Sequence, residues 1–354
     1  MSALELILRI LQFKQGEQKH QLESDCRTIS VFMIKVRATL EERNLLFCVK
    51  VLENVPGYSV TSSTFSFIMP LSRLNSVLCS THSNGPKEWK DVSANCGQKK
   101  QSPINVITHD AKFDSKLEPF KFEGYDQGKT LTLKNNGHSA QLGLDSAMKI
   151  SGGGLSGTYT ATQLHFHWGS KDKPGSEHTL NGKQYPIELH IVHQQAARSD
   201  PSGGSTATGG LAVLGFFFTE GKDNEHYSNL IGGLSKIVNL DSTTTISDVK
   251  LKDLIPAEEE LKLFYRYEGS LTTPLCNETV TWTVFPAPIE LGKSQIEAFY
   301  TNLKYSDDKL MTDNFRPIQK LNERTIYTSG VDAILPYSRY LLISLLVFYL
   351  TSVS

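Results

Sequence analysis

Two segments of the chain carry histidines at a spacing that suits a metal ion. Residues 163–168 read QLHFHW, and residues 188–193 read ELHIVH. Alternate side chains of a strand share one face, so a strand places His165 and His167 on the same side. His190 supplies a third imidazole if the two strands lie side by side. Three neutral nitrogen ligands leave the fourth tetrahedral position of zinc open for water, as in catalytic zinc sites.

The alternative is that these residues are hydrogen-bonded core histidines, which is the usual role of a single buried histidine. Two neighbouring residues favour the metal. Gln163 lies two positions before His165, and Glu188 lies two positions before His190. Such polar residues are needed to orient imidazoles that bind a metal. We therefore expect a zinc site rather than three structural histidines.

The elements that must position these histidines are mostly strands. Apolar and alternating runs between Gly, Asn, Asp and Pro turns predict strands over residues 129–134, 138–144, 157–168, 186–194, 211–219 and 278–285. Helical spacing is confined to short pieces, chiefly residues 225–238 and 294–305. Residues 202–210 are rich in Gly, Ser and Thr and predict a loop.

Composition sets the outer bounds. The chain has 354 residues, 39% of them hydrophobic and 21% charged, which is typical of a globular protein. This length allows one large domain with appendages or two ordinary domains. The net charge of −1, without a long run of one sign, excludes nucleic acid as an expected partner.

The first eighty residues carry no recognisable motif. Residues 4–13 and 32–51 favour short helices. The apolar runs near the N-terminus are interrupted by charged residues or proline, so a secretory signal peptide is not evident. We hypothesise that this stretch is an unusual first segment, and a propeptide or a partner-binding arm are the alternatives.

The C-terminal residues 330–354 have the layout of a lipid-anchor signal. Ser329 and Gly330 are followed by a short spacer and an apolar run from Tyr340. The uncharged run covers about 22 Å as a helix, short of the ~30 Å hydrocarbon core of a bilayer. We therefore predict a glycolipid (GPI) anchor attached at Ser329. The alternatives are a tail-anchored helix with Arg339 at the interface and a buried terminal helix.

The cysteines bear on the cellular compartment. Of the five, only Cys96 and Cys276 lie in the strand-rich part, and a bond between them needs an oxidising compartment. The other three precede it (Cys26, Cys48 and Cys79). Residues 277–279 read NET, so Asn277 lies in a glycosylation sequon that fits the same export route, although it is crowded against Cys276.

Residues 83–329 closely resemble the alpha-class carbonic anhydrases. Besides the two histidine segments, they carry the family's motifs in the family's order: QSPIN (101–105), NNGH (135–138), GSEHT (175–179), GSLTTP (269–274), VTW (280–282) and NFRP (314–317). The positions of the two cysteines, the phrase ISGGGL (150–155) and the anchor signal are most similar to the membrane-anchored carbonic anhydrase IV type. Upstream of Asn84 the family's usual aromatic residues are missing, and residues 78–80 read LCS.

The resemblance implies a mainly β (α+β) fold with a large, twisted, mostly antiparallel central sheet and short peripheral helices. It also implies three parts: an unassigned extension (1–82), the carbonic anhydrase domain (83–329) and the C-terminal anchor signal (330–354).

The implied function is zinc-dependent, reversible hydration of carbon dioxide to bicarbonate and a proton by zinc-bound hydroxide. In this resemblance Thr272 aligns the hydroxide while donating to Glu177, and Thr273 contacts substrate or bicarbonate. His138 would relay the proton to bulk water, because an imidazole titrates near neutral pH. Orientation of the ligands falls to Gln163, Glu188 and Asn314, and His178 and His193 look structural. The apolar carbon dioxide pocket would be lined by Val192, Val213, Leu271, Val280 and Trp282.

The rival is a non-catalytic carbonic-anhydrase-like binding module, but such relatives typically lack a zinc histidine and this chain has all three. Another zinc hydrolase is disfavoured because no HExxH motif is present. The expected location is the outer face of the plasma membrane, reached through the lipid anchor. Besides carbon dioxide, bicarbonate and water, bicarbonate transporters are an expected class of partner.

Overall fold

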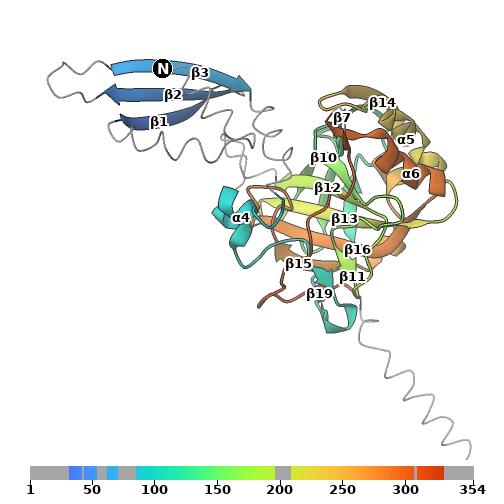
Figure 1. Cartoon of the computed structure of the whole chain (residues 1–354). Coiled ribbons are helices and arrows are strands. Elements are labelled where there is room, and N and C mark those ends of the chain that lie inside the picture. The colour runs from blue at the N-terminus through green and yellow to red at the C-terminus, as the bar shows by residue number, and fades with distance from the viewer. Residues whose placement is uncertain are drawn as a thin grey trace, which may run out of the picture. The chain divides into compact units, whose positions relative to one another are not determined.

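The computed structural model describes residues 85–330 apart from 196–208 and 307–308, together with the backbone of three N-terminal strands. The chain divides into two compact units, Met1–Val77 and Leu78–Ser354, which we describe separately (Figure 1).

The first unit holds a three-stranded antiparallel sheet in the order β1-β2-β3, formed by Phe32–Glu41, Asn44–Glu53 and Ser62–Pro70. Leu40 pairs with Leu45, so β1 and β2 form a hairpin. The short helices expected over residues 32–51 are therefore wrong. Residues 34–41 read IKVRATLE, an alternation of apolar and polar residues that indicates a strand. The helix expected over residues 4–13 lies outside the described residues.

The second unit is built on a twisted sheet of twelve described strands. The strand order along the main path is β14-β7-β8-β10-β12-β13-β16-β15-β19-β5; off this path, β9 pairs with β10 and β6 pairs with β9. Most neighbours are antiparallel, whereas the pairs β13–β16 and β19–β5 are parallel. The mainly β fold with a large central sheet is confirmed.

The strands of this sheet have the following bounds: β5 Lys112–Phe113, β6 Phe120–Glu123, β7 Lys129–Asn135, β8 Ala140–Gly143, β9 Lys149–Gly152, β10 Tyr159–Trp168, β12 Ile187–Gln195, β13 Leu211–Glu220, β14 Thr243–Val249, β15 Tyr265–Gly269, β16 Val280–Leu291 and β19 Tyr327–Thr328. Two short pairs lie apart from it: β4 Asn105–Val106 with β11 Thr179–Leu180, and β17 Lys304–Ser306 with β18 Lys309–Leu310. Each of the six predicted strands overlaps one of these.

Helices of the described part are short and peripheral (Figure 1): α4 Trp89–Val92, α5 Ser228–Leu234 and α6 Lys293–Asn302, with 3-10 turns η1 Ala94–Gly97, η2 Thr108–Asp110, η4 Glu225–Tyr227, η5 Leu251–Leu254 and η6 Glu260–Lys262. The helix predicted over 225–238 is the η4–α5 pair and ends at Leu234. The helix predicted over 294–305 is α6, and Tyr305 belongs to β17 instead. Most of the predicted 202–210 loop lies outside the described residues.

The period-two alternation of β10 decides which side chains enter the core. Leu164, Phe166 and Trp168 are at most 1% exposed and belong to the larger hydrophobic cluster. The residues between them are polar (Gln163, His165 and His167) and therefore face the other side of the sheet. Burial of the apolar set thus fixes the register that presents the histidines.

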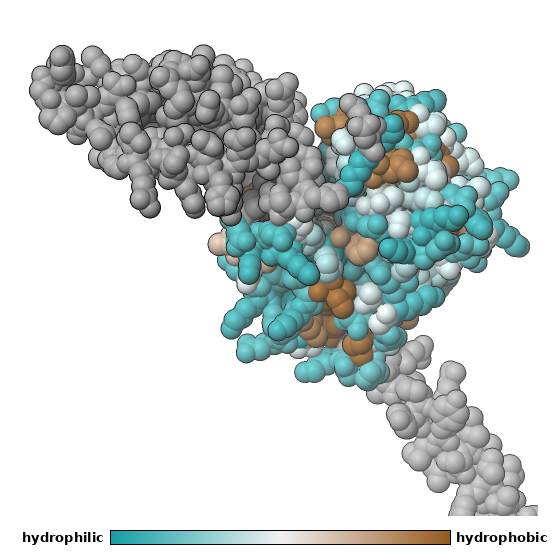
Figure 2. Space-filling view, viewed as in Figure 1, coloured by the Kyte–Doolittle hydropathy of each residue, from teal (hydrophilic) through white to brown (hydrophobic). Residues whose placement is uncertain are grey.

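On the face shown in Figure 2, hydrophilic residues predominate and apolar residues form small separate patches. In the part of the chain that the structure describes, no helix is long and apolar enough to span a bilayer. The predicted anchor signal, from residue 331 onward, lies outside the described residues.

Candidate metal centre and active site

The three predicted ligands come together on the β10–β12 pair. The strands are antiparallel, and His165 lies directly opposite His190 while His167 lies opposite Glu188. The ring centroids of the three histidines are 4.7–5.2 Å apart, and one nitrogen of each ring lies within 4.8 Å of the other two. Neighbouring strands therefore place three imidazoles around one point.

Two of these rings are oriented by a hydrogen bond through Nδ1. His165 Nδ1 lies 2.8 Å from Oε1 of Gln163, and His167 Nδ1 lies 2.8 Å from the carbonyl oxygen of Asn314. A carbonyl oxygen only accepts, so Nδ1 of each ring carries the proton and Nε2 presents a lone pair. Nε2 of His167 is buried and has no hydrogen-bond partner. Leaving such a group unpaired is costly, and a cation at this point would satisfy it.

The third ring is oriented through Nε2. His190 Nε2 donates to Oε1 of Glu188 at 2.7 Å, which leaves its Nδ1 facing the other two rings. Glu188 also accepts from the Nδ1 and the backbone N–H of His178, both at 2.7 Å. Burial raises the pKa of the Glu188 carboxyl, but the neighbouring His178 and His190 outweigh it and hold that pKa well below its ordinary value of 4.5.

His178, Glu188 and His190 also satisfy the distance criterion for a metal cluster. Their polar atoms already bond one another at 2.7 Å, and His178 Nε2 is paired with the hydroxyl of Tyr267 at 2.6 Å. This second group is therefore a hydrogen-bond network that supports His190 and not another metal site.

Burial keeps two of the three candidate ligands, His165 and His167, neutral. Burial, followed by the nearby His167 and His190, lowers the pKa of His165 well below 6.5, and burial lowers the pKa of His167. A neutral imidazole retains the lone pair that a metal needs. Three imidazole nitrogen donors with supporting hydrogen bonds fit zinc.

Glu177 lies beside this centre. Its Oε1 accepts the backbone N–H of Arg316 at 2.7 Å, whereas Oε2 is buried without a hydrogen-bond partner, 3.5 Å from His167 Nε2. Thr272 is buried, at 6% exposure. The hydrogen bond expected between Thr272 and Glu177 is not formed in this structure, so Oε2 remains an available acceptor.

His138 lies in the turn between β7 and β8. Its backbone N–H donates to Oδ1 of Asn136 at 2.9 Å, and its carbonyl accepts from Nδ2 of Asn314 at 2.8 Å. The side chain is half-buried, its Nδ1 has no partner, and burial lowers its pKa. Gly137 has φ +85°, and a Cβ there would meet Leu240 at 2.7 Å, so this turn requires glycine.

The residues predicted to hold carbon dioxide pack together. Val213, Val280 and Trp282 are at most 2% exposed, and Val192 and Leu271 pack against the same hydrophobic cluster. The Trp282 ring lies 4.8 Å from the His190 ring, so this apolar cluster borders the metal centre. Thr273 is exposed.

Three residues that hold this site were missed by sequence reasoning. Arg316 positions Glu177 through its backbone, while its buried guanidinium donates to oxygens of Gln101, Ser102 and Cys96. Gly215 lies opposite His190, where a Cβ would come within 3.2 Å of Glu188 Oε1.

The third is Ser139, whose hydroxyl bonds both backbone groups of Phe166, between the two ligands of β10. Only Gly215 had a local signal in the sequence, because a glycine inside an apolar strand indicates that another group approaches the backbone closely. Arg316 and Ser139 act through contacts with distant segments, which residue spacing in the sequence does not indicate.

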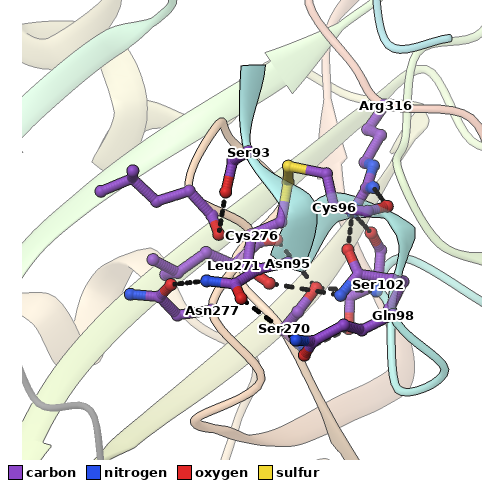
Figure 3. The surroundings of a disulfide bond; sticks show 12 residues. Ser93, Asn95, Cys96, Gln98, Ser102, Ser270, Leu271, Cys276, Asn277 and Arg316 are labelled. Atoms are coloured by element: carbon purple, nitrogen blue, oxygen red, sulfur yellow. Dashed lines mark hydrogen bonds between the residues drawn. A yellow bond between two sulfur atoms is a disulfide. The ribbon is translucent and has the colours of Figure 1, made fainter. Parts of the chain in front are cut away.

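The remaining predicted residues are not part of the histidine cluster. The disulfide between Cys96 and Cys276 is confirmed (Figure 3). Asn277 accepts a hydrogen bond from Asn95. Ser329 follows β19, where its hydroxyl donates to the carbonyl of Lys262 at 2.7 Å.

Comparison with known proteins gives a consistent result. Residues 84–330 match the family of eukaryotic-type carbonic anhydrases. Carbonic anhydrase 4 of Oryctolagus cuniculus is 43% identical over 248 residues, which are 69% of this chain and 80% of that protein. Carbonic anhydrase 12 of Homo sapiens is 39% identical, with 70% of this chain and 71% of that protein covered. A putative carbonic anhydrase 3 of Caenorhabditis elegans is 39% identical, with 70% and 95% covered.

Proposed function

Because the chain belongs to the eukaryotic-type carbonic anhydrase family and is an enzyme of that type, we propose that it hydrates carbon dioxide reversibly with a zinc ion held by His165, His167 and His190. The observation that carries this proposal is the buried, unpartnered Nε2 of His167 beside the two other oriented imidazoles. When bound, zinc supplies Lewis acidity, which lowers the pKa of a coordinated water and provides a nucleophile at neutral pH.

The protein's own part is to orient the three imidazole rings and to exclude water from the site. Gln163, Asn314 and Glu188 hold the three rings through the nitrogens that face away from the metal point. The apolar cluster of Val213, Val280 and Trp282 borders this point and suits an uncharged substrate with few polar handles.

Thr272 and Glu177 would align the attack. Oε2 of Glu177 has no hydrogen-bond partner and can accept a hydrogen bond from the hydroxyl of Thr272. The Thr272 oxygen can then accept a hydrogen bond from the attacking solvent oxygen. That oxygen keeps a lone pair directed at carbon, and Thr273 would contact the substrate or the bicarbonate product. His138 would carry the released proton to bulk water through intervening waters.

The test is metal content together with stopped-flow carbon dioxide hydration, measured for the parent and for His165→Ala. The proposal requires one zinc and rapid hydration in the parent and loss of both in the variant. Zinc without hydration would favour the alternative, a non-catalytic binding module. His226→Gln is the matched control, because His226 has a 62% exposed side chain.

We also propose that residues 83–329 form the catalytic domain, that residues 1–82 are a separate extension, and that a glycolipid attached at Ser329 anchors the protein to the outer cell surface. The C-terminal pattern and the disulfide, which needs an oxidising compartment, support export. Release from cells by a phospholipase that cleaves glycolipid anchors would test the anchor. Bicarbonate transporters as partners stay a prediction.

A further inference from the structure

The side chain of Asn277 has a fixed orientation beside the disulfide. Gln98 Nε2 donates to Asn95 Oδ1 at 3.1 Å, and Asn95 Nδ2 donates to Asn277 Oδ1 at 2.8 Å. This relay points the oxygen of the Asn277 amide toward Asn95 and its nitrogen away from Asn95, as Figure 3 shows. Asn277 Nδ2 makes no hydrogen bond and is not among the buried unpartnered atoms, so it reaches solvent.

The threonine of the sequon is buried in the folded domain. The hydroxyl of Thr279 is buried without a hydrogen-bond partner, and the residue is 4% exposed. The carbonyl of Asn277 accepts backbone N–H groups from Leu271 and Thr279, at 3.1 and 2.9 Å. The three residues therefore form a tight turn in which the threonine hydroxyl, which completes the acceptor motif, is inaccessible.

We propose that Asn277 is an N-linked glycosylation site that is modified on the unfolded chain, before Cys96 and Cys276 join. Asn277 Nδ2 attacks C1 of the first sugar of a polyisoprenyl-pyrophosphate-linked oligosaccharide. The N–C1 bond forms, the C1–O bond to pyrophosphate breaks, the lipid pyrophosphate leaves, and the amide loses one proton to a base of the transferring enzyme. In the folded chain the modified amide keeps the oxygen that bonds Asn95, and its sugar extends into solvent.

Disulfide closure competes with this modification. Cys276 immediately precedes Asn277, and its partner lies 180 residues earlier in the sequence. Cys96 is therefore synthesised first and is already available when Cys276 emerges. Closing the bond draws the turn into the folded domain and hides the Thr279 hydroxyl. The two reactions share one stretch of chain, so the glycan is present on only a fraction of the molecules.

The first test compares two substitutions of Thr279 in the full chain expressed in cells with a secretory pathway. Thr279→Ser keeps the acceptor motif, and Thr279→Val removes it without breaking a hydrogen bond, since Oγ1 has none. The parent and Thr279→Ser should show a mobility shift that a peptide N-glycosidase removes, and Thr279→Val should show none. A parent that carries no glycan at Asn277 by peptide mass spectrometry overturns the proposal.

The second test addresses the order of events. Cys96→Ser removes the competing bond and leaves residues 274–282 unchanged, and Cys48→Ser is the matched control. The glycosylated fraction should rise in Cys96→Ser and stay at the parent's value in Cys48→Ser. Because the gel counts chains whether or not they fold, a folding defect does not obscure the result. Equal occupancy in all three proteins would overturn the proposed order.

Discussion

His190 and His193 lie three residues apart on β12 and face opposite sides of the sheet. Both are essentially buried, at 1% and 0% exposure. His190 has one nitrogen bonded to Glu188 and directs the other toward His165 and His167. His193 has both nitrogens engaged, Nε2 with the Tyr125 hydroxyl at 2.7 Å and Nδ1 with the Ala212 carbonyl at 3.3 Å.

The difference teaches that the hydrogen-bond partners of the ring nitrogens, and not burial, separate a candidate metal ligand from a structural histidine. A buried imidazole with two partners is complete within the protein. An imidazole with one partner and a second nitrogen facing other imidazoles is complete only with a further ligand. His167 makes this contrast sharpest, since its Nε2 is buried and unpaired while His178 has partners for both nitrogens.

The largest effect should follow loss of an unpaired ligand. His167→Ala should weaken zinc binding by more than the roughly 10–100-fold that loss of an outer partner costs, and hydration should fall with the metal. Zinc titration against a chelator, together with stopped-flow hydration, checks this. Full zinc content in His167→Ala would break the comparison, because the unpaired nitrogen of His167 would then not be needed to bind the metal.

Loss of His138 should act on proton transfer alone. His138→Ala should keep zinc but hydrate carbon dioxide roughly 100-fold more slowly in weak buffer, with recovery on addition of imidazole. Burial lowers the pKa of His138 below 6.5, so its neutral, proton-accepting form persists below that pH. The parent should therefore keep buffer-independent turnover in mildly acidic solution. Unchanged turnover in weak buffer would refute the shuttle.

Glu188→Gln tests the support of a ligand. The amide keeps an oxygen that can accept from one histidine, but it loses the charge that serves His178 and His190 together. Zinc affinity should fall by roughly 10–100-fold. Glu268→Gln is the control, because it makes the same change at a carboxyl that bonds the hydroxyl of Thr281 and not a histidine. Burial raises the pKa of this carboxyl, whereas the pKa of Glu188 is lowered. Equal zinc affinity in Glu188→Gln and the parent would contradict a role in orienting His190.

Much of the fold and the ligand set could be predicted because both depend on a period of two. Alternation within β10 predicted the strand and placed His165 and His167 on one face. Pairing with β12 was an added assumption, and the observed register of His165 with His190 agrees with it. The family resemblance supplied the roles of Thr272, Glu177 and His138, which spacing alone does not indicate.

The rest depends on contacts between distant segments. Arg316 reaches Glu177 across 139 residues, and Asn314 reaches the His138 carbonyl across 176. No local pattern encodes such pairs. The helices expected over residues 32–51 are wrong for another reason: residues 34–41 alternate apolar and polar residues, which is the period of a strand and not of a helix.

The smallest effect on activity should come from His193, and it sharpens the comparison from its structural side. Burial lowers the pKa of His193 to about 4 in the folded state, against 6.5 for an unperturbed histidine. The unfolded chain therefore binds a proton first as pH falls. The contribution of neutral His193 is complete above pH 6.5 and is lost between about 6.5 and about 4, a span worth about 3 kcal/mol.

His193→Gln should leave zinc binding and hydration near the parent's values, because Gln can accept from Tyr125 and no metal ligand is removed. Its free energy of unfolding should fall less steeply between pH 7 and pH 5 than the parent's, since the titrating group is gone. Urea unfolding at both pH values measures this difference. The contributions of the carboxylates and of the other histidines cancel between the parent and the variant. Parallel pH dependences would mean that His193 titrates normally, and a parallel loss of zinc would mean that the two faces of β12 are not independent.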